Sequence, residues 1–129
     1  MTNAAMLQAD DLAALARPGI AYMIHPNAGE DVHAALLAMT LRVGVATYVR
    51  QNEAVLARAD LRPVLAGVHV PTMIVVGADD LMTPPALSEE LRDGITGAIL
   101  HVIPDCGHLP PIEAPQALAA LMVEWLKAP

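Results

Sequence analysis

Several residue types that carry familiar protein chemistry are scarce in this sequence of 129 residues. A single cysteine, Cys106, excludes an internal disulfide framework. Aromatic residues make up only 2% of the chain, and no apolar run approaches the roughly 18 residues that a membrane-spanning helix needs. The N-terminal stretch MTNAAMLQADD has neither a basic region nor a long apolar core. We therefore expect no signal peptide, no membrane partner and a cytoplasmic location.

Positive charge is also scarce, because seven Lys and Arg residues stand against fourteen Asp and Glu residues, a formal net charge of -7. From residue 71 onward, eight acidic residues are balanced only by Arg92 and Lys127. Such a surface repels phosphate backbones, so we expect no nucleic acid partner. Four histidines lack the spacing of metal ligands, and we predict neither a metal nor a cofactor; these are His25, His33, His69 and His101.

The composition is that of a globular protein, with 55% hydrophobic and 16% charged residues. Within it, two short apolar runs, 72–76 and 99–103, are bounded by Pro and Gly. Each is typical of a strand buried on both faces of a parallel sheet. A polar loop follows each run, and the two loops contain Asp80 and His108. Because the carboxyl ends of parallel strands meet at one edge of a sheet, these side chains are expected there together.

A helix is expected between the two runs. Thr83 is placed as its N-cap and Pro84 at its first position, where a missing N–H costs nothing. Leu87 and Leu91 give this helix a narrow apolar stripe. A right-handed crossover would then set the two strands side by side and parallel. A closing amphipathic helix is defined by Leu118, Leu121, Met122, Trp125 and Leu126.

The first half of the sequence shows helical periodicity. One helix is predicted from Leu7 to Ala16, ended by Pro18-Gly19, and another from Val32 to Val43. A third is predicted from about Val45 to Arg58 after an interruption at Gly44.

Two strands are too few for a stable parallel sheet, since an open strand edge invites pairing with another chain. We therefore expect the open edge of the strand pair to be covered by another chain. This chain would be either a second copy in a homo-oligomer or a complementing N-terminal half of the same domain.

The pattern G-x-x-D-x-x-x-P follows the first run as Gly77, Asp80 and Pro84, and Gly107-His108 follows the second. With the flanking VPT, IP and EAP elements, this arrangement resembles the C-terminal portion of the α/β-hydrolase superfamily. Residues 1–69 resemble the helical cap that precedes this portion in many members. The resemblance implies an α/β fold class, a partial α/β-hydrolase fold in which residues 70–129 form a β-α-β-α unit with parallel strands.

The resemblance further implies a Ser-Asp-His triad with Asp80 as the acid and His108 as the general base. Imidazole titrates near neutrality, so it can take a proton from a nucleophile and return it to a leaving group. A carboxylate on the other ring nitrogen fixes the tautomer. The expected substrate is a small molecule with an ester- or lactone-type carbonyl bond. In such enzymes the cap lines the acyl or leaving-group pocket, so the resemblance implies that role for Tyr22, Met23, Met39 and Tyr48, although packing within the core of the cap is the favoured interpretation.

The sequence contains no G-x-S-x-G elbow for a nucleophile. Its only serine, Ser88, is placed on an exposed face of the predicted helix, and Cys106 lies too close to His108 to occupy an elbow on another strand. The serine is therefore expected from outside this chain. Two alternatives stay open: a non-catalytic remnant that binds a partner or itself, and a metal-free perhydrolase or haloperoxidase that uses the same triad.

Overall fold

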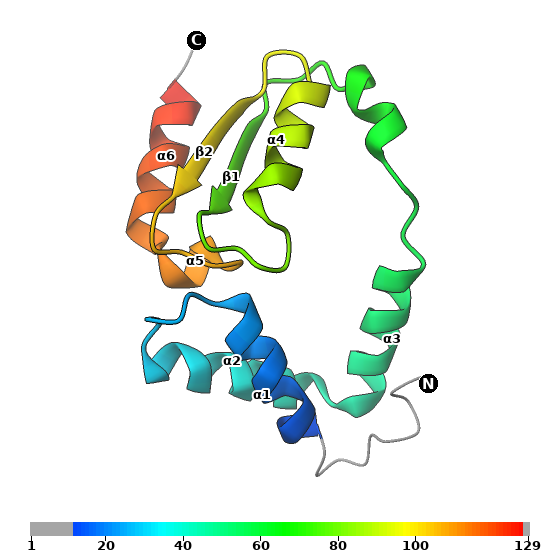
Figure 1. The fold of residues 1–129 in the computed structure, drawn as a ribbon, viewed down its shortest axis with the longest axis vertical. Coiled ribbons are helices and arrows are strands. Elements are labelled where there is room, and N and C mark those ends of the chain that lie inside the picture. Colours follow the sequence, from blue (N-terminus) through cyan, green and yellow to red (C-terminus); the bar gives the residue numbers. More distant parts are fainter. Residues whose placement is uncertain (1–11, 128–129) are drawn as a thin grey trace. The chain divides into compact units, whose positions relative to one another are not determined.

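The computed structural model describes residues 12–127, which form two compact units. Among these residues, the first unit comprises 12–21 and 29–60, and the second comprises 22–28 and 61–127. Every described residue of the first unit that has regular structure is helical. Both strands and both loops with candidate catalytic side chains belong to the second unit (Figure 1).

Helix α1 spans Leu12–Met23 and continues through Pro18, so the prediction that Pro18-Gly19 ends the first helix is wrong. Residues 7–11 of that predicted helix lie outside the described residues. Leu12, Ala16 and Ile20 are buried at a spacing of four, on one face of the helix. Burial of this apolar stripe offsets the cost of a proline inside a helix, which is about 3 kcal/mol.

Gly44 separates helix α2 (Glu30–Val43) from helix α3 (Val45–Leu56), as the sequence predicts. Its φ angle of 76° lies in the left-handed region, where glycine has no side-chain penalty. Among residues 12–127, no single helix has the length and apolar composition to cross a membrane. Helices α2 and α3 meet those two criteria only as a pair, across a bend of 97°.

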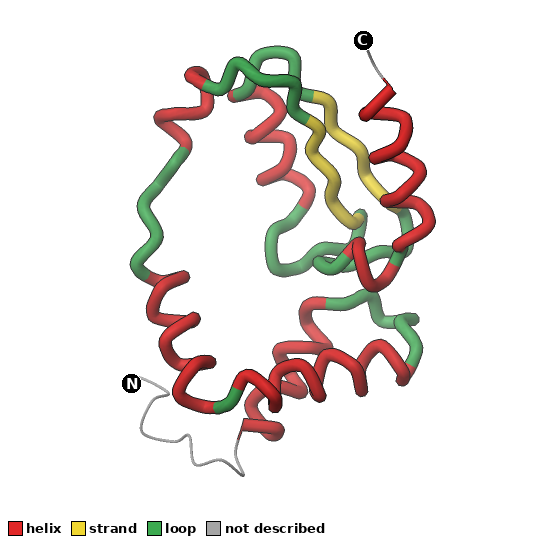
Figure 2. The backbone as a smooth tube through the Cα atoms, turned by 180° about the vertical axis from the view of Figure 1, so that it is seen from behind, coloured by secondary structure: helices red, strands yellow, loops and turns green. Residues whose placement is uncertain are grey.

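The second unit is built on two parallel strands, β1 (Met73–Gly77) and β2 (Ile99–Ile103), with Met73 opposite Ile99 and Gly77 opposite Ile103. Helix α4 (Pro85–Gly94) connects them and lies on one side of the pair, and α6 (Pro115–Lys127) lies on the other (Figures 1 and 2). The short helices η3 (Arg62–Gly67) and α5 (Pro110–Glu113) precede β1 and α6. The predicted parallel β-α-β-α order is confirmed.

Helix α4 differs from its prediction in two ways. It begins at Pro85 with Pro84 as the N-cap, and Thr83 makes no cap. Leu87 and Leu91, the predicted apolar stripe, are exposed, whereas Ser88 is buried, so the prediction that Ser88 lies on an exposed face is wrong. A small side chain at Ser88 permits a close approach of α4 to the strands that it contacts.

The strands are buried only at their carboxyl ends. Val76, Gly77 and Ile103 are buried, but Ile99 is 52% and Val102 48% exposed. The prediction that both faces are buried is therefore wrong for the described chain, because two helices cannot cover all the surface of the strand pair. The well-packed part of the strand pair is therefore its carboxyl edge, where the loops that contain Asp80 and His108 begin.

Candidate active site

The two loops that follow β1 and β2 are joined through their backbones. The N–H of Ala78 donates to the carbonyl oxygen of Ile103 at 2.8 Å, and the N–H of Asp79 donates to that of Cys106 at 2.9 Å. A Cβ atom at Gly77 would overlap the Cys106 carbonyl group, so glycine permits this close approach. The hydrogen bonding between the strands thus extends into the loops and draws them together.

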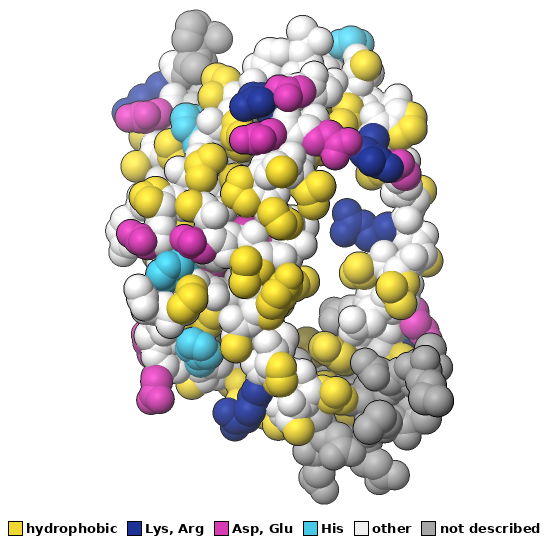
Figure 3. Space-filling model, viewed as in Figure 1, with side chains coloured by type: hydrophobic (Ala, Val, Ile, Leu, Met, Phe, Trp, Pro, Cys, Tyr) yellow, Lys and Arg dark blue, Asp and Glu magenta, His cyan; other side chains and the backbone are white. Residues whose placement is uncertain are grey.

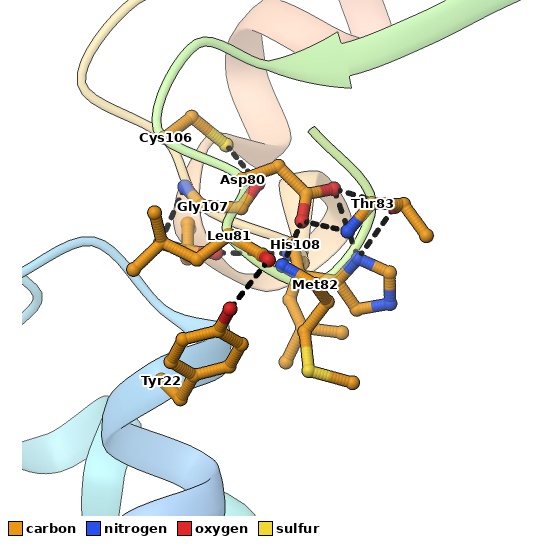
Figure 4. Close-up of polar contacts among 10 residues, drawn as sticks. Tyr22, Asp80, Leu81, Met82, Thr83, Cys106, Gly107 and His108 are labelled. Atoms are coloured by element: carbon orange, nitrogen blue, oxygen red, sulfur yellow. Dashed lines mark hydrogen bonds and ion pairs between the residues drawn. The ribbon is translucent and has the colours of Figure 1, made fainter. Parts of the chain in front are cut away.

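Asp80 is the central side chain of the site, and it is only 5% exposed. Its Oδ1 accepts hydrogen bonds from the backbone N–H groups of Met82 and Thr83, each at 2.9 Å. Its Oδ2 accepts one from the Thr83 hydroxyl at 2.9 Å and lies 2.9 Å from Nδ1 of His108 (Figure 4). The structure therefore brings together Asp80 and His108, the two residues predicted from the sequence.

Burial and hydrogen bonding act on the pKa of Asp80 in opposite directions. Burial raises this pKa, whereas hydrogen bonds from the Thr83 backbone, the His108 ring and the Thr83 hydroxyl lower it. The hydrogen bonds prevail, and the pKa of Asp80 lies below its ordinary value of 3.8. Asp80 is therefore ionised at neutral pH.

The protonation of His108 follows from its partner. An ionised carboxylate can only accept hydrogen bonds, so the Nδ1 atom that faces Asp80 carries the hydrogen. The Thr83 Oγ1 atom, 3.2 Å from Nδ1, is a second acceptor for the same hydrogen. In neutral imidazole the lone pair then resides on Nε2. The His108 side chain is 32% exposed, which leaves a base accessible at the edge of a buried carboxylate.

Thr83 belongs to the site, although the sequence analysis assigned it to a helix cap. Its hydroxyl binds Asp80 and contacts His108 instead of the first turn of α4. The spacing D-x-x-T is a signal for this role, because an Asp side chain commonly bonds the backbone and side chains of the next few residues in a turn.

Glu113 is a second residue that the sequence analysis missed. Its carboxylate accepts hydrogen bonds from the backbone N–H groups of His25, Gly107 and Leu109 at 2.7, 3.0 and 2.9 Å. Two of these amides flank His108. The EAP element contained this residue, but no spacing rule connects a glutamate to amides in a distant segment.

Apolar side chains of the Asp80 loop are exposed, and so is Tyr22, which bonds to this loop. Tyr22 is 52% exposed and donates its hydroxyl hydrogen to the carbonyl oxygen of Leu81 at 2.9 Å. Leu81 and Met82 are exposed in the Asp80 loop, and the Leu81 side chain points away from the His108 ring in Figure 4. Tyr22 and Met39 are both more exposed than the core packing favoured for them predicts.

Neither candidate for an internal nucleophile has suitable surroundings. Cys106 is fully buried, and burial, followed by the charges of Glu113, Asp80 and Asp79, raises the pKa of its thiol to about 11. Ser88 is buried within α4, away from any strand-to-helix turn. Among the described residues, no group of three or more His, Cys, Asp or Glu side chains could hold a metal ion.

Comparison with known proteins gives a consistent family assignment. A family model described as "Alpha/beta hydrolase family" matches residues 2–121. A pimeloyl-[acyl-carrier protein] methyl ester esterase of Neisseria meningitidis is 27% identical over 105 residues. That alignment covers 81% of this chain but only 41% of the esterase.

Solved structures show the same partial coverage. An enol-lactonase from Burkholderia xenovorans LB400 superposes with a TM-score of 0.78 and 30% identity, over 98% of this chain and 48% of the lactonase. A hydrolase from Pseudomonas aeruginosa PA01 superposes with a TM-score of 0.82 and 30% identity, over 97% of this chain and 48% of the hydrolase. This chain therefore spans about half the length of the relatives that it matches.

Proposed function

Because the chain belongs to the alpha/beta hydrolase family, we propose that Asp80 and His108 are the acid and the base of a hydrolase for ester- or lactone-type carbonyl bonds. The observation that carries this proposal is the 2.9 Å contact between Nδ1 of His108 and Oδ2 of Asp80, which leaves Nε2 as the basic nitrogen. The names of the similar proteins, a methyl ester esterase and an enol-lactonase, support the substrate class.

The serine nucleophile comes from outside this chain, in a complementing segment that corresponds to the part of the relatives that the chain does not span. The burial of Ser88 and Cys106, together with the raised pKa of the Cys106 thiol, supports this step. So does the exposure of apolar side chains in the second unit, which a complementing segment would cover. These are Ile99 and Val102 on β2 and Met122, Val123 and Leu126 on α6.

In the proposed reaction, Nε2 of His108 takes the hydroxyl proton of the serine while the serine oxygen bonds to the substrate carbonyl carbon. The tetrahedral intermediate then collapses, the bond to the leaving oxygen breaks, and His108 gives its proton to that oxygen. A water molecule releases the acyl group by the same two proton transfers. Throughout, ionised Asp80 stabilises the imidazolium that forms at His108.

The apolar surroundings suit such a substrate. Leu81 and Met82 of the Asp80 loop are exposed, as is Tyr22, which bonds to this loop, and apolar walls with few polar groups are typical of small-molecule sites. The net charge of -7 disfavours polyanionic substrates.

The test is labelling with a fluorophosphonate, a probe that reacts with activated serines, followed by intact mass spectrometry of natively purified protein. We expect the label on a co-purifying serine-bearing chain and none on this chain. His108→Ala should abolish the labelling, whereas the control His69→Ala, at an exposed position, should not. A label on Ser88, or labelling that survives His108→Ala, would contradict the proposal.

A second candidate function is a non-catalytic module that binds a partner or another copy of itself. The exposed apolar residues of β2 and α6 favour it, and Figure 3 shows further apolar side chains at the surface over α4 and the loop before it. Val102→Asp on β2 should then weaken association, whereas His108→Ala should leave it unchanged. Fluorophosphonate labelling of a co-purifying chain that depends on His108 would exclude this second candidate.

A further inference from the structure

Glu113 bonds both amides that flank His108 in the chain. Its Oε2 accepts the N–H of Gly107 at 3.0 Å, and its Oε1 accepts the N–H of Leu109 at 2.9 Å. The same Oε2 accepts the N–H of His25 at 2.7 Å, from a different segment of the second unit. Hydrogen bonds to an ionised group are roughly twice as strong as neutral ones, so one side chain fastens the His108 loop to the segment at His25.

The amide of His108 itself is fixed by that same segment. It donates to the carbonyl oxygen of Met23 at 2.6 Å. Each of the three consecutive amides 107–109 therefore donates a hydrogen bond, and two of the three donate to the Glu113 carboxylate. A Cβ atom at Gly107 would lie 2.7 Å from the His25 nitrogen and from the Met23 oxygen. The backbone at His108 is consequently held tightly against residues 23–25.

Asp80 alone does not determine where the ring of His108 lies. The carboxylate binds Nδ1, but the side chain could reach it from several backbone positions through rotation about its two χ angles. The position of the His108 Cα atom decides which rotamer makes this contact and where Nε2 then points.

We propose that Glu113 is a positioning residue for His108. It holds the loop backbone so that Nδ1 reaches Asp80 and the Nε2 lone pair faces away from the carboxylate. Glu113 acts through the amides of Gly107 and Leu109, not through the substrate. The inference rests on the proposed role of His108 as the base.

The test compares Glu113→Gln with Glu124→Gln in the full chain. Glutamine has the size of glutamate, but its amino group cannot accept the N–H groups that a carboxylate oxygen accepts. Glu124 lies on the exposed face of α6 and is the matched control. Two quantities are measured by NMR: hydrogen exchange of the Gly107 and Leu109 amides, and the ring nitrogen shifts of His108 as a function of pH, which report the tautomer.

In Glu113→Gln we expect exchange at Gly107 and Leu109 to be about tenfold faster. The His108 ring should shift from the Nδ1–H tautomer toward the mixture of Nδ1–H and Nε2–H tautomers found in an unrestrained histidine. Glu124→Gln should change neither the exchange rates nor the tautomer. Faster exchange with an unchanged His108 tautomer and titration would overturn the proposal, because Glu113 would then only stabilise the loop.

If Glu113→Gln does not fold, Glu113→Asp provides the same comparison, since the shorter carboxylate keeps the charge but cannot reach all three amides. Loss of the fold in both variants would also overturn the proposal, because Glu113 would then serve the whole unit. Neither measurement needs a serine or a substrate. Absence of fluorophosphonate labelling on every co-purifying chain, together with an intact Nδ1–H tautomer in the wild-type chain, would therefore contradict the proposed function and leave the role of Glu113 standing.

Discussion

Nδ1 of His108 lies 2.9 Å from Oδ2 of Asp80, although 28 residues separate the two in the chain. The contact depends on the parallel pairing of β1 and β2, which places the loops after both strands at the same edge. It depends also on Gly77, where a Cβ atom would overlap the backbone of Cys106 and Gly107. The pair is therefore set by the β-α-β unit itself.

The first prediction concerns acid stability. The pKa of Asp80 is lowered in the folded protein, so the ionised form stabilises the fold, and this contribution is present above the ordinary pKa of 3.8. It is lost as the pH falls from about 4 through the lower folded-state pKa. The free energy of unfolding, measured by urea titration at a series of pH values, should fall over this pH range.

Asp80→Asn should remove that part of the acid dependence and lower stability at neutral pH by about 1–3 kcal/mol, because an amide nitrogen would face donors. Asp105→Asn is the control, since Asp105 is exposed and its left-handed backbone, with φ of 51°, also suits asparagine. If the free energy of unfolding falls equally steeply with decreasing pH in Asp80→Asn and in the wild type, the prediction is contradicted.

The second prediction is that Cys106 is inert in the folded protein. Its thiol is fully buried and its pKa is raised to about 11, so almost no thiolate is present or accessible at neutral pH. Iodoacetamide should modify it only after unfolding in urea, as followed by intact mass spectrometry. Modification of native protein at a rate close to that of the unfolded chain would show that the loop opens readily.

The third prediction concerns the point at which the loops meet. Gly77→Ala should destabilise the protein by roughly 3 kcal/mol or more, because the new Cβ atom would overlap the carbonyl groups of Cys106 and Gly107, which belong to the backbone and cannot rotate away. Gly67→Ala is the matched control, since nothing lies within 4 Å of a Cβ atom there. Equal unfolding midpoints for the two variants would contradict this account.

The sequence predicted the strands, their parallel order and the candidate pair because these depend on local periodicity and on one handedness rule. It failed where tertiary contacts override local preference. Pro18 lies inside a helix because an apolar stripe is buried there, and Leu87 and Leu91 are exposed although they form the apolar side of α4. Glu113 could not be found, because its three partners are backbone amides that carry no sequence signature.

The fourth prediction concerns Thr83, whose hydroxyl donates to Oδ2 of Asp80 and lies 3.2 Å from Nδ1 of His108. Thr83→Val keeps the shape of the side chain but removes the donor. The pKa of Asp80 should therefore rise, and the unfolding free energy should fall by about 1 kcal/mol. Thr83→Ser keeps the hydroxyl and is the control.

The two variants also separate hydrogen bonding from packing at this position. If the hydroxyl matters, the carboxyl NMR signal of Asp80 should titrate at higher pH in Thr83→Val and near the wild-type pH in Thr83→Ser. If only packing matters, Thr83→Ser should be the less stable variant, since it loses a methyl group, and the Asp80 titration should be unchanged in both. The second pattern would mean that the backbone N–H groups of Met82 and Thr83, together with His108, suffice to hold Asp80 ionised.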